Sequence, residues 1–334
     1  EAPAFDGEAE LTYLVTHYRQ QSTNPMLDEQ VTRALPRARL RGRMHLERYF
    51  SKGGGEFRQT LEPQLQYLYV PYENQQNIGI YDTTLMQDDY NGLFRAQRFS
   101  GLDRIAEANQ VTYGASSSLF NANEREVLRV SLGQIYYFDN SRTQLLDSQS
   151  QVTSSNSEWV ADVNWALDSQ WSFRSAIQYD TELNRTRKSQ TALEYRIDDK
   201  NLVQINHRKA TNILNNDIEQ MGTQAVWEIS KQWQVAANVY YDLSNDRVND
   251  AIVGVQYSSC CWALRLSAYR RINRDLEPGN AAAGMMNISG NPAEFDNGVS
   301  LQFIISGLSS DSSSLIDMLE KSIYGYRRPF YLSN

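Results

Sequence analysis

Between residues 157 and 273 the sequence repeats one unit: about ten residues of alternating apolar and polar character, then a connection rich in Asp, Asn, Ser and Thr. In EWVADVNWAL, for example, Trp159, Ala161 and Val163 occupy every second position and polar residues stand between them. Because successive side chains of a strand point to opposite faces, this period predicts β-strands with one apolar and one polar face. We count eight consecutive strands here, which predicts an antiparallel meander.

The same alternation predicts strands elsewhere, for a total of about fourteen. Those outside the meander are expected near residues 8–20, 35–47, 56–70, 107–121, 124–138 and 296–307. The last of them, in NGVSLQFIISGL, carries Val299, Leu301, Phe303 and Ile305 on one face. The pattern therefore predicts an all-β chain.

Aromatic residues indicate where such strands would lie. Trp or Tyr begins or ends several of them: Trp159, Trp171, Tyr179, Tyr195, Trp227, Trp233, Tyr241, Tyr257 and Trp262. Aromatic girdles at both ends of an apolar strand face are typical of outer-membrane barrels, whereas no apolar run approaches the roughly 18–20 residues of a membrane-spanning helix. We therefore expect a transmembrane antiparallel β-barrel of outer-membrane type. The alternative is a soluble sandwich with Trp in its core.

A row of basic residues distinguishes the second predicted strand. In LPRARLRGRMHLE, Arg37, Arg39, Arg41 and Arg43 alternate with small or apolar residues. If the apolar face meets lipid, the arginines project into a polar lumen. Two hypotheses follow: they bind an anionic group in the lumen, or they pair with Glu and Asp on neighbouring strands.

Connection lengths predict an orientation, because outer-membrane barrels alternate short periplasmic turns with long extracellular loops. Counting back from a periplasmic C-terminus, the long segments 274–295, 139–157, 71–106 and 21–29 fall outside, and the short turns 167–170, 198–200 and 230–232 fall in the periplasm. The long segment 71–106 is too apolar for a solvated loop, so we expect it to fold inward or to cap a partner.

The only two cysteines, Cys260 and Cys261, are adjacent and lie on the periplasmic side in this scheme, where disulfides persist. A bond between neighbours closes a strained ring, so disulfide partners are expected outside this chain. The alternative is two inert thiols in a turn.

Composition and motifs exclude other functions. The net charge of −8 disfavours nucleic-acid binding. The three histidines, His17, His45 and His207, are far apart and belong to no catalytic motif, and the cysteines lack metal-site spacing, so we expect no catalytic residues, no metal and no cofactor. The nucleotide-binding motif GxxxxGK[ST] is absent from the sequence, so any energy that the function of this chain requires would come from another protein.

Several phrases resemble one family. TLEPQLQYLYVPY (60–72), DYNGLFRAQRFSGLDRIAEANQVT (89–112), GQIYYF (133–138) and above all VGVQYSSCC (253–261) are similar to signatures of the LptD family of lipopolysaccharide-assembly proteins of the Gram-negative outer membrane. The resemblance covers essentially the whole chain.

The resemblance implies a 26-stranded barrel preceded by a periplasmic domain. We therefore expect this chain to be the C-terminal half of that barrel, with strands and extracellular loops over 1–310 and a tail over 311–334. The absence of a signal peptide in EAPAFDGEAE agrees with a mature chain or a fragment. By the same resemblance, Cys260 and Cys261 each bond to a cysteine of the periplasmic domain, and the strand with Val299, Leu301, Phe303 and Ile305 closes the barrel at a lateral gate.

The function implied is that of a non-enzymatic translocon subunit that inserts lipopolysaccharide into the outer leaflet. Its expected partners are lipopolysaccharide, the plug lipoprotein LptE, the periplasmic bridge protein LptA through the N-terminal domain, and the barrel-assembly machinery during folding. With these partners, the arginine row would guide the phosphorylated saccharide of lipopolysaccharide or contact an acidic plug, and the segment 71–106 would pack against the plug lipoprotein. The alternative is a self-contained general porin, for which a cysteine pair has no use.

Overall fold

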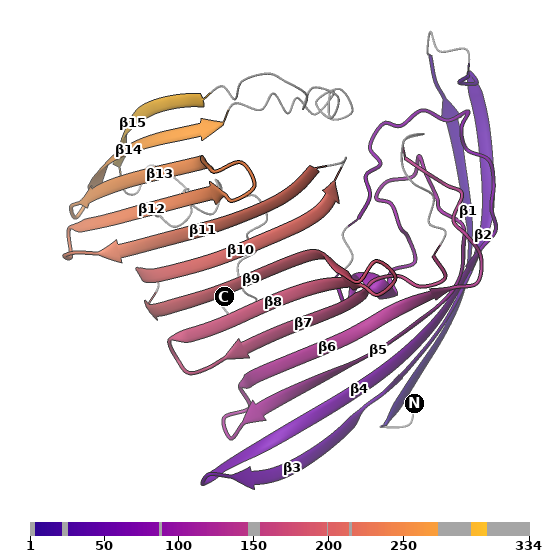
Figure 1. Ribbon diagram of the computed structural model, residues 1–334, viewed down its shortest axis with the longest axis horizontal. Helices are drawn as coiled ribbons and strands as arrows, with labels where there is room; N and C mark the ends of the chain where they lie inside the picture. The colour runs from indigo at the N-terminus through magenta and orange to yellow at the C-terminus, as the bar shows by residue number, and fades with distance from the viewer. Residues whose placement is uncertain are drawn as a thin grey trace. The chain divides into compact units, whose positions relative to one another are not determined.

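A computed structural model of the chain describes residues 4–21, 26–86, 89–145, 154–198, 200–213, 216–272 and 295–305. These ranges contain fifteen β-strands and one short 3-10 helix, η1 (Gly92–Phe94) (Figure 1). Every strand register between neighbours is antiparallel where it is defined, which confirms the all-β, antiparallel expectation. In the described ranges, no helix is both long and apolar enough to cross a bilayer.

The chain divides into two compact units, Glu1–Ala166 with Arg174–Arg187 and Leu167–Phe173 with Lys188–Asn334. The expected boundary at residue 310 lies outside the described residues, as do the tail 311–334 and nearly all of the predicted loop 274–295.

Unit 1 holds the first seven strands. They are β1 (Phe5–Arg19), β2 (Gln30–Met44), β3 (Leu46–Lys52), β4 (Gly55–Val70), β5 (Ala108–Asn121), β6 (Glu126–Tyr137) and β7 (Trp159–Ala166). Their spatial order is β1-β2-β4-β5-β6-β7, and β3 pairs with β4. Consecutive strands therefore lie side by side, as a meander requires.

The expected single strand over 35–47 appears as two, which is why the count is fifteen and not about fourteen. Arg43 of β2 pairs with Gln64, and Leu46 of β3 pairs with Leu61, in one unbroken register along β4. Pro63, which this register places opposite Met44, has no N–H to donate, so the ladder is interrupted there.

Unit 2 contains the remaining strands, with β8 and β9 shared at the division. The bounds are β8 (Trp171–Asp180), β9 (Arg185–Asp198), β10 (Asn201–Ile213), β11 (Asn216–Glu228), β12 (Trp233–Asp242), β13 (Arg247–Ser258), β14 (Trp262–Ile272) and β15 (Phe295–Ile305). From β9 to β15 each strand pairs with the next. All eight strands expected between 157 and 273 are present.

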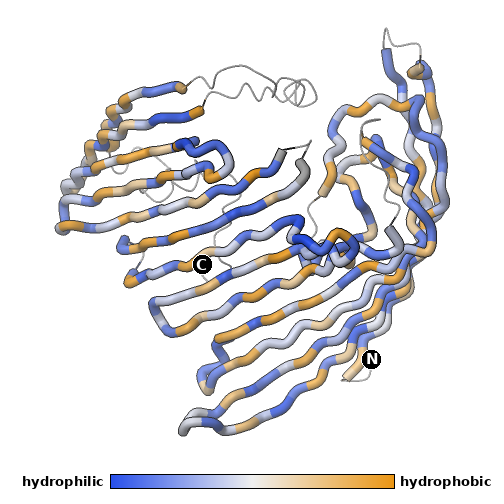
Figure 2. Tube along the Cα trace, in the orientation of Figure 1, coloured by the Kyte–Doolittle hydropathy of each residue, from blue (hydrophilic) through white to orange (hydrophobic). Residues whose placement is uncertain are grey.

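Hydropathy alternates along the strands in both units (Figure 2). On β1, Leu11 and Tyr13 are 83% and 67% exposed, whereas Glu10 and Thr12, which alternate with them, are only partly exposed. The tryptophans are not core residues either, since Trp171 is 39% exposed. Large apolar side chains on an open face are unfavourable in water and favourable against lipid, which disfavours the soluble sandwich.

Candidate functional site

The arginine row lies on the polar face of β2, and its first two members contact glutamates of β1. In the β1–β2 register, Arg39 is opposite Glu10 and Arg41 is opposite Glu8. The Nη2 atom of Arg39 lies 2.8 Å from Glu8 and 2.6 Å from Glu10, and that of Arg37 lies 3.3 Å from Glu10. This half of the row therefore has the cross-strand carboxylate partners that one of the two sequence hypotheses expected.

The second half of the row has a different environment. Arg41 and Arg43 both donate through Nη2 to the side-chain oxygen of Gln64 on β4, at 2.9 Å and 3.3 Å. Among the described residues, no carboxylate oxygen lies within 4.0 Å of either guanidinium group. Two cations thus share one neutral acceptor.

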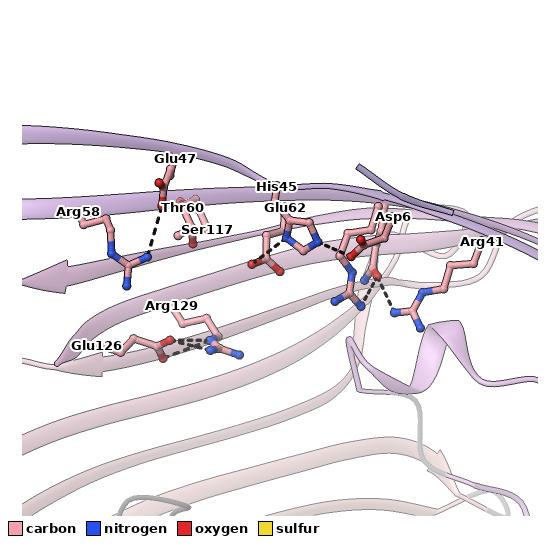
Figure 3. A network of polar contacts seen from close by, with 12 residues as sticks. Asp6, Arg41, His45, Glu47, Arg58, Thr60, Glu62, Ser117, Glu126 and Arg129 are labelled. Atoms are coloured by element: carbon pink, nitrogen blue, oxygen red, sulfur yellow. Dashed lines mark hydrogen bonds and ion pairs between the residues drawn. The ribbon is translucent and has the colours of Figure 1, made fainter. Parts of the chain in front are cut away.

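His45 comes two residues after Arg43, at the C-terminal end of the row. Its Nε2 lies 2.7 Å from Asp6 and its Nδ1 lies 3.6 Å from Glu62, so this imidazole, and not an arginine, engages both nearby carboxylates (Figure 3).

The long connection between β4 and β5 packs onto the same face. In it, Tyr90, Leu93 and Phe94 are buried and cluster with Ile135 of β6 and Val160 of β7. The expectation that the apolar segment folds inward is therefore correct within unit 1. Whether it also contacts a plug protein remains a prediction.

Two glycines make room for this loop. Gly114 of β5 is the cross-strand partner of Gly133 of β6. A Cβ atom added to Gly114 would lie 2.9 Å from the ring of Tyr90 and 2.8 Å from the carbonyl oxygen of Leu132. A Cβ atom on Gly133 would lie 3.0 Å from Leu93. The pair forms a notch in the sheet that only glycine leaves open.

Polar contacts fix the loop in the notch. Gln64 Nε2 donates to Tyr90 Oη at 2.9 Å, the Tyr90 amide donates to Asp162 at 3.0 Å, and Thr112 Oγ1 donates to the Leu93 carbonyl at 3.2 Å. Gln64 therefore connects the loop to the arginine row.

A buried arginine of β2 also holds the loop, near both of its ends. Arg33 of β2 is 1% exposed and donates to Gln75 Oε1 at 2.6 Å and to the carbonyls of Leu102 and Asp103. Burial acts to raise the pKa of Asp103, but amide donors, Tyr81 N at 2.7 Å among them, outweigh it, so its pKa is lowered and the carboxylate stays ionised.

Cys260 and Cys261 lie in the tight turn between β13 and β14, which the hydrogen bond from Ser259 N to Trp262 O closes at 2.8 Å. Both cysteines are exposed and free, with their Sγ atoms 2.9 Å apart. The hydrogen bond from Cys260 and a smaller burial effect raise the pKa of the Cys261 thiol. The thiols are therefore accessible to a partner.

Aromatic rings border this turn. Tyr257, near the end of β13, lies 5.5 Å from Trp262 and 5.0 Å from Trp233 between ring centroids. Trp262 in turn stacks on Phe303 at 5.8 Å. Such a continuous aromatic row is typical of the membrane–water boundary, and the cysteines follow it directly.

The proposed gate residues lie on β15, which pairs with β14. Val299, Leu301, Phe303 and Ile305 are 73%, 67%, 62% and 45% exposed and share one face, as the alternation predicted. Their role at a gate stays a prediction.

Some residues of the site were not singled out from the sequence. Glu8 and Glu10 continue the alternation of β1, and Arg33 continues the period of the arginine row, so period-two counting could have found them. Gln64 continues the polar period of β4, but only the β2–β4 register places it beside the row, and Tyr90 carries no such signal because the packing of the loop brings it there. In the part of the chain that the structure describes, no three His, Cys, Asp or Glu side chains gather as metal ligands.

Comparison with known proteins gives matches over the whole chain. The family model LptD, "LPS transport system D", matches residues 3–233. The LPS-assembly protein LptD of Idiomarina loihiensis is 70% identical over 335 residues, covering 100% of this chain and 44% of the relative. The LPS-assembly proteins LptD of Shewanella frigidimarina and Pseudoalteromonas translucida are 40% and 39% identical, covering 100% and 98% of this chain and 44% and 43% of their own lengths. The chain thus spans less than half the length of these relatives.

Solved structures give only weak matches. A mutant of the porin of Rh. blastica has a TM-score of 0.30 at 12% identity, covering 80% of this chain and 92% of the porin. The ferric-catecholate import receptor Fiu of E. coli K12 has a TM-score of 0.34 at 12% identity, covering 88% of this chain and 50% of the receptor.

Proposed function

Because this chain belongs to the LPS transport system D family, LptD, we propose that it forms part of an outer-membrane translocon that inserts lipopolysaccharide into the outer leaflet. The family consists of outer-membrane β-barrel proteins, and the exposed apolar strand faces of this chain suit contact with lipid. The observation that carries the proposal is the 70% identity with an LPS-assembly protein along the whole chain.

The polar face of unit 1 supports the proposal chemically. Lipopolysaccharide has a phosphorylated, sugar-rich head and an acyl part, so a transport path needs cationic and hydrogen-bonding side chains on a face that is separate from the lipid-facing one. Arginines, glutamines and serines of β2, β4 and β5 supply such a face, with Arg41 and Gln64 in mutual contact. Transport requires no covalent chemistry from these residues, and the relatives are named for assembly and not for catalysis.

The proposed partners are those that the family resemblance implied. A plug lipoprotein, LptE, would lie against the polar face and the loop 71–107, and the bridge protein LptA would deliver lipopolysaccharide through a periplasmic domain of the longer protein. The barrel-assembly machinery would fold it. The loop would then be extracellular and the turn with Cys260 and Cys261 periplasmic.

Two further assignments belong to the same proposal. Cys260 and Cys261 would each bond to a cysteine of the periplasmic domain, and their exposure on a short turn supports this. The strand β15, with Leu301 and Phe303 on its apolar face, would border a lateral opening, and its end position in the strand order of unit 2 supports that role.

Depletion of the full-length protein in its native host tests the function. Lipopolysaccharide should accumulate in the inner membrane while its surface-exposed fraction, measured by labelling of intact cells, falls to background. Uptake of a small hydrophilic solute is the control. A loss of solute uptake with unchanged surface lipopolysaccharide would favour the general porin and contradict the transport function.

A further inference from the structure

Charge is unevenly compensated along the arginine row. Arg37 and Arg39 share two carboxylates, those of Glu8 and Glu10, at 2.6 to 3.3 Å. Arg41 and Arg43 have no carboxylate within 4.0 Å among the described residues. Glu8, opposite Arg41, contacts Arg39 instead, and Asp6, opposite Arg43, contacts His45, as does Glu62. Arg37 and Arg39 therefore contact carboxylates directly, whereas Arg41 and Arg43, which we call the uncompensated half of the row, contact none.

The geometry of the uncompensated half suits an anionic oxygen. Arg41 and Arg43 are two residues apart on one strand face, about 7 Å between Cα atoms. Their Nη2 atoms nevertheless converge on one atom, Gln64 Oε1, at 2.9 and 3.3 Å. A charged oxygen at or beside this point would accept stronger bonds than an amide oxygen does, since charge-assisted hydrogen bonds are roughly twice as strong as neutral ones.

The surroundings strengthen such an interaction. The Phe94 ring lies 5.9 Å from the Arg41 guanidinium carbon, and Tyr90 Oη holds the Gln64 amide in orientation. Gln66, directly opposite Arg41, is fully buried, and neither its amide nitrogen nor its oxygen has a hydrogen-bond partner among the described residues. Partial exclusion of water raises the strength of charge–charge contacts, and the free amide offers a further donor.

We propose that Arg41, Arg43 and Gln64 form a subsite for a phosphate group. Its ligand is a phosphate of the lipopolysaccharide head, an assignment that rests on the proposed transport function. Arginine suits this ligand because its planar fork matches two phosphate oxygens. Arg37 and Arg39, held by glutamates, border the subsite and do not bind the phosphate.

The test is lipid A binding by the full-length protein in detergent. The probes are lipid A with both phosphates and the same lipid after enzymatic removal of both, with matched acyl chains. The wild-type protein should bind the phosphorylated form at least about tenfold more tightly, as expected for a single charge-assisted contact of about 1.5 kcal/mol or more. The double substitution R41Q/R43Q should abolish most of this preference.

The chain offers a matched control and a variant that should change the preference for phosphorylated lipid A in the opposite direction. R37Q/R39Q removes the same charge from the neighbouring half of the row and should leave the preference within about threefold. E8Q/E10Q releases Arg37 and Arg39 from their carboxylates, so it should increase the preference, a gain that misfolding cannot produce. R41K/R43K keeps the charge but loses the fork and should give an intermediate value.

Equal binding of the two lipids by the wild-type protein would overturn the subsite, and so would equal losses in R37Q/R39Q and R41Q/R43Q. Either result leaves the transport function standing if depletion still blocks lipopolysaccharide export. Competition by inorganic pyrophosphate in the wild-type protein but not in R41Q/R43Q would identify the phosphate, and not the acyl chains, as the group recognised.

Discussion

The connection from β4 to β5 and the turn from β13 to β14 differ in where their side chains go. The first, residues 71–107, buries Ile78, Leu93 and Phe99 to 1–2% exposure against its own sheet and its own backbone. The second, 259–261, has nothing of its own to pack against and leaves Cys260 and Cys261 exposed. A long connection has enough side chains to bury apolar area, whereas a tight turn has too few. The turn therefore leaves its two thiol groups exposed.

The loop and the turn are also stabilised by different interactions. The loop depends on a shape match between Tyr90 and the Gly114–Gly133 notch and on ionised groups such as Arg33 and Asp103. The turn depends on a backbone hydrogen bond from Ser259 and on the strands beside it. Perturbations should therefore affect the loop strongly and the turn weakly.

The largest expected effect comes from filling the notch. Gly114→Val places atoms where Tyr90 and the Leu132 carbonyl already lie, so we expect the loop to leave the sheet at a cost of about 1–3 kcal/mol. Limited trypsin digestion should then cut at Arg95 or Arg98 much faster than in the wild type. The control is Gly42→Val, since a Cβ atom there lies 3.5 Å from the Phe5 ring, an ordinary contact. Equal protection of both variants would mean that the notch does not hold the loop.

A smaller effect is expected from pH. Because the pKa of Asp103 is lowered in the folded loop, its contribution to stability is complete above its unfolded-state pKa of about 3.9 and declines as the pH falls through the folded-state value. The Tyr81 and Asp82 amides donate to this carboxylate, so their hydrogen-exchange protection, measured relative to the intrinsic exchange rate at each pH, should fall in acid. In Asp103→Asn this acid sensitivity should disappear. An unchanged pH profile in that variant would assign the sensitivity to another group.

The smallest structural effect is expected at the turn. Cys260→Ser and Cys261→Ser replace exposed side chains, so the free energy of unfolding of the barrel should change by no more than about 0.5 kcal/mol under reducing conditions. Without reduction, a peptide map of the full-length wild-type protein should link the segment 248–265 to cysteines outside the sequence printed above. Each single variant should lose one of these links. Free thiols in the native protein, or a bond between the two neighbours, would contradict the external disulfides.

The sequence alone predicted what depends on local period. Alternation with a period of two decides which side chains share a strand face, so it was sufficient for the strands themselves, apart from the division of 35–47, and for the common faces of Arg37 to Arg43 and of Val299 to Ile305. It was also sufficient for the position of the cysteine turn, because Trp262 and Tyr257 mark the strand ends beside it.

Only the tertiary structure decided which groups meet. Gly114 and Gly133 become a notch because the β5–β6 register aligns them, and Pro63 divides a strand because it stands across from Met44. The difference between the two halves of the arginine row likewise depends on which residues of β1 and β4 lie opposite each arginine. Register joins residues distant in sequence, and a local pattern cannot specify it because every register that conserves the two faces satisfies the same alternation.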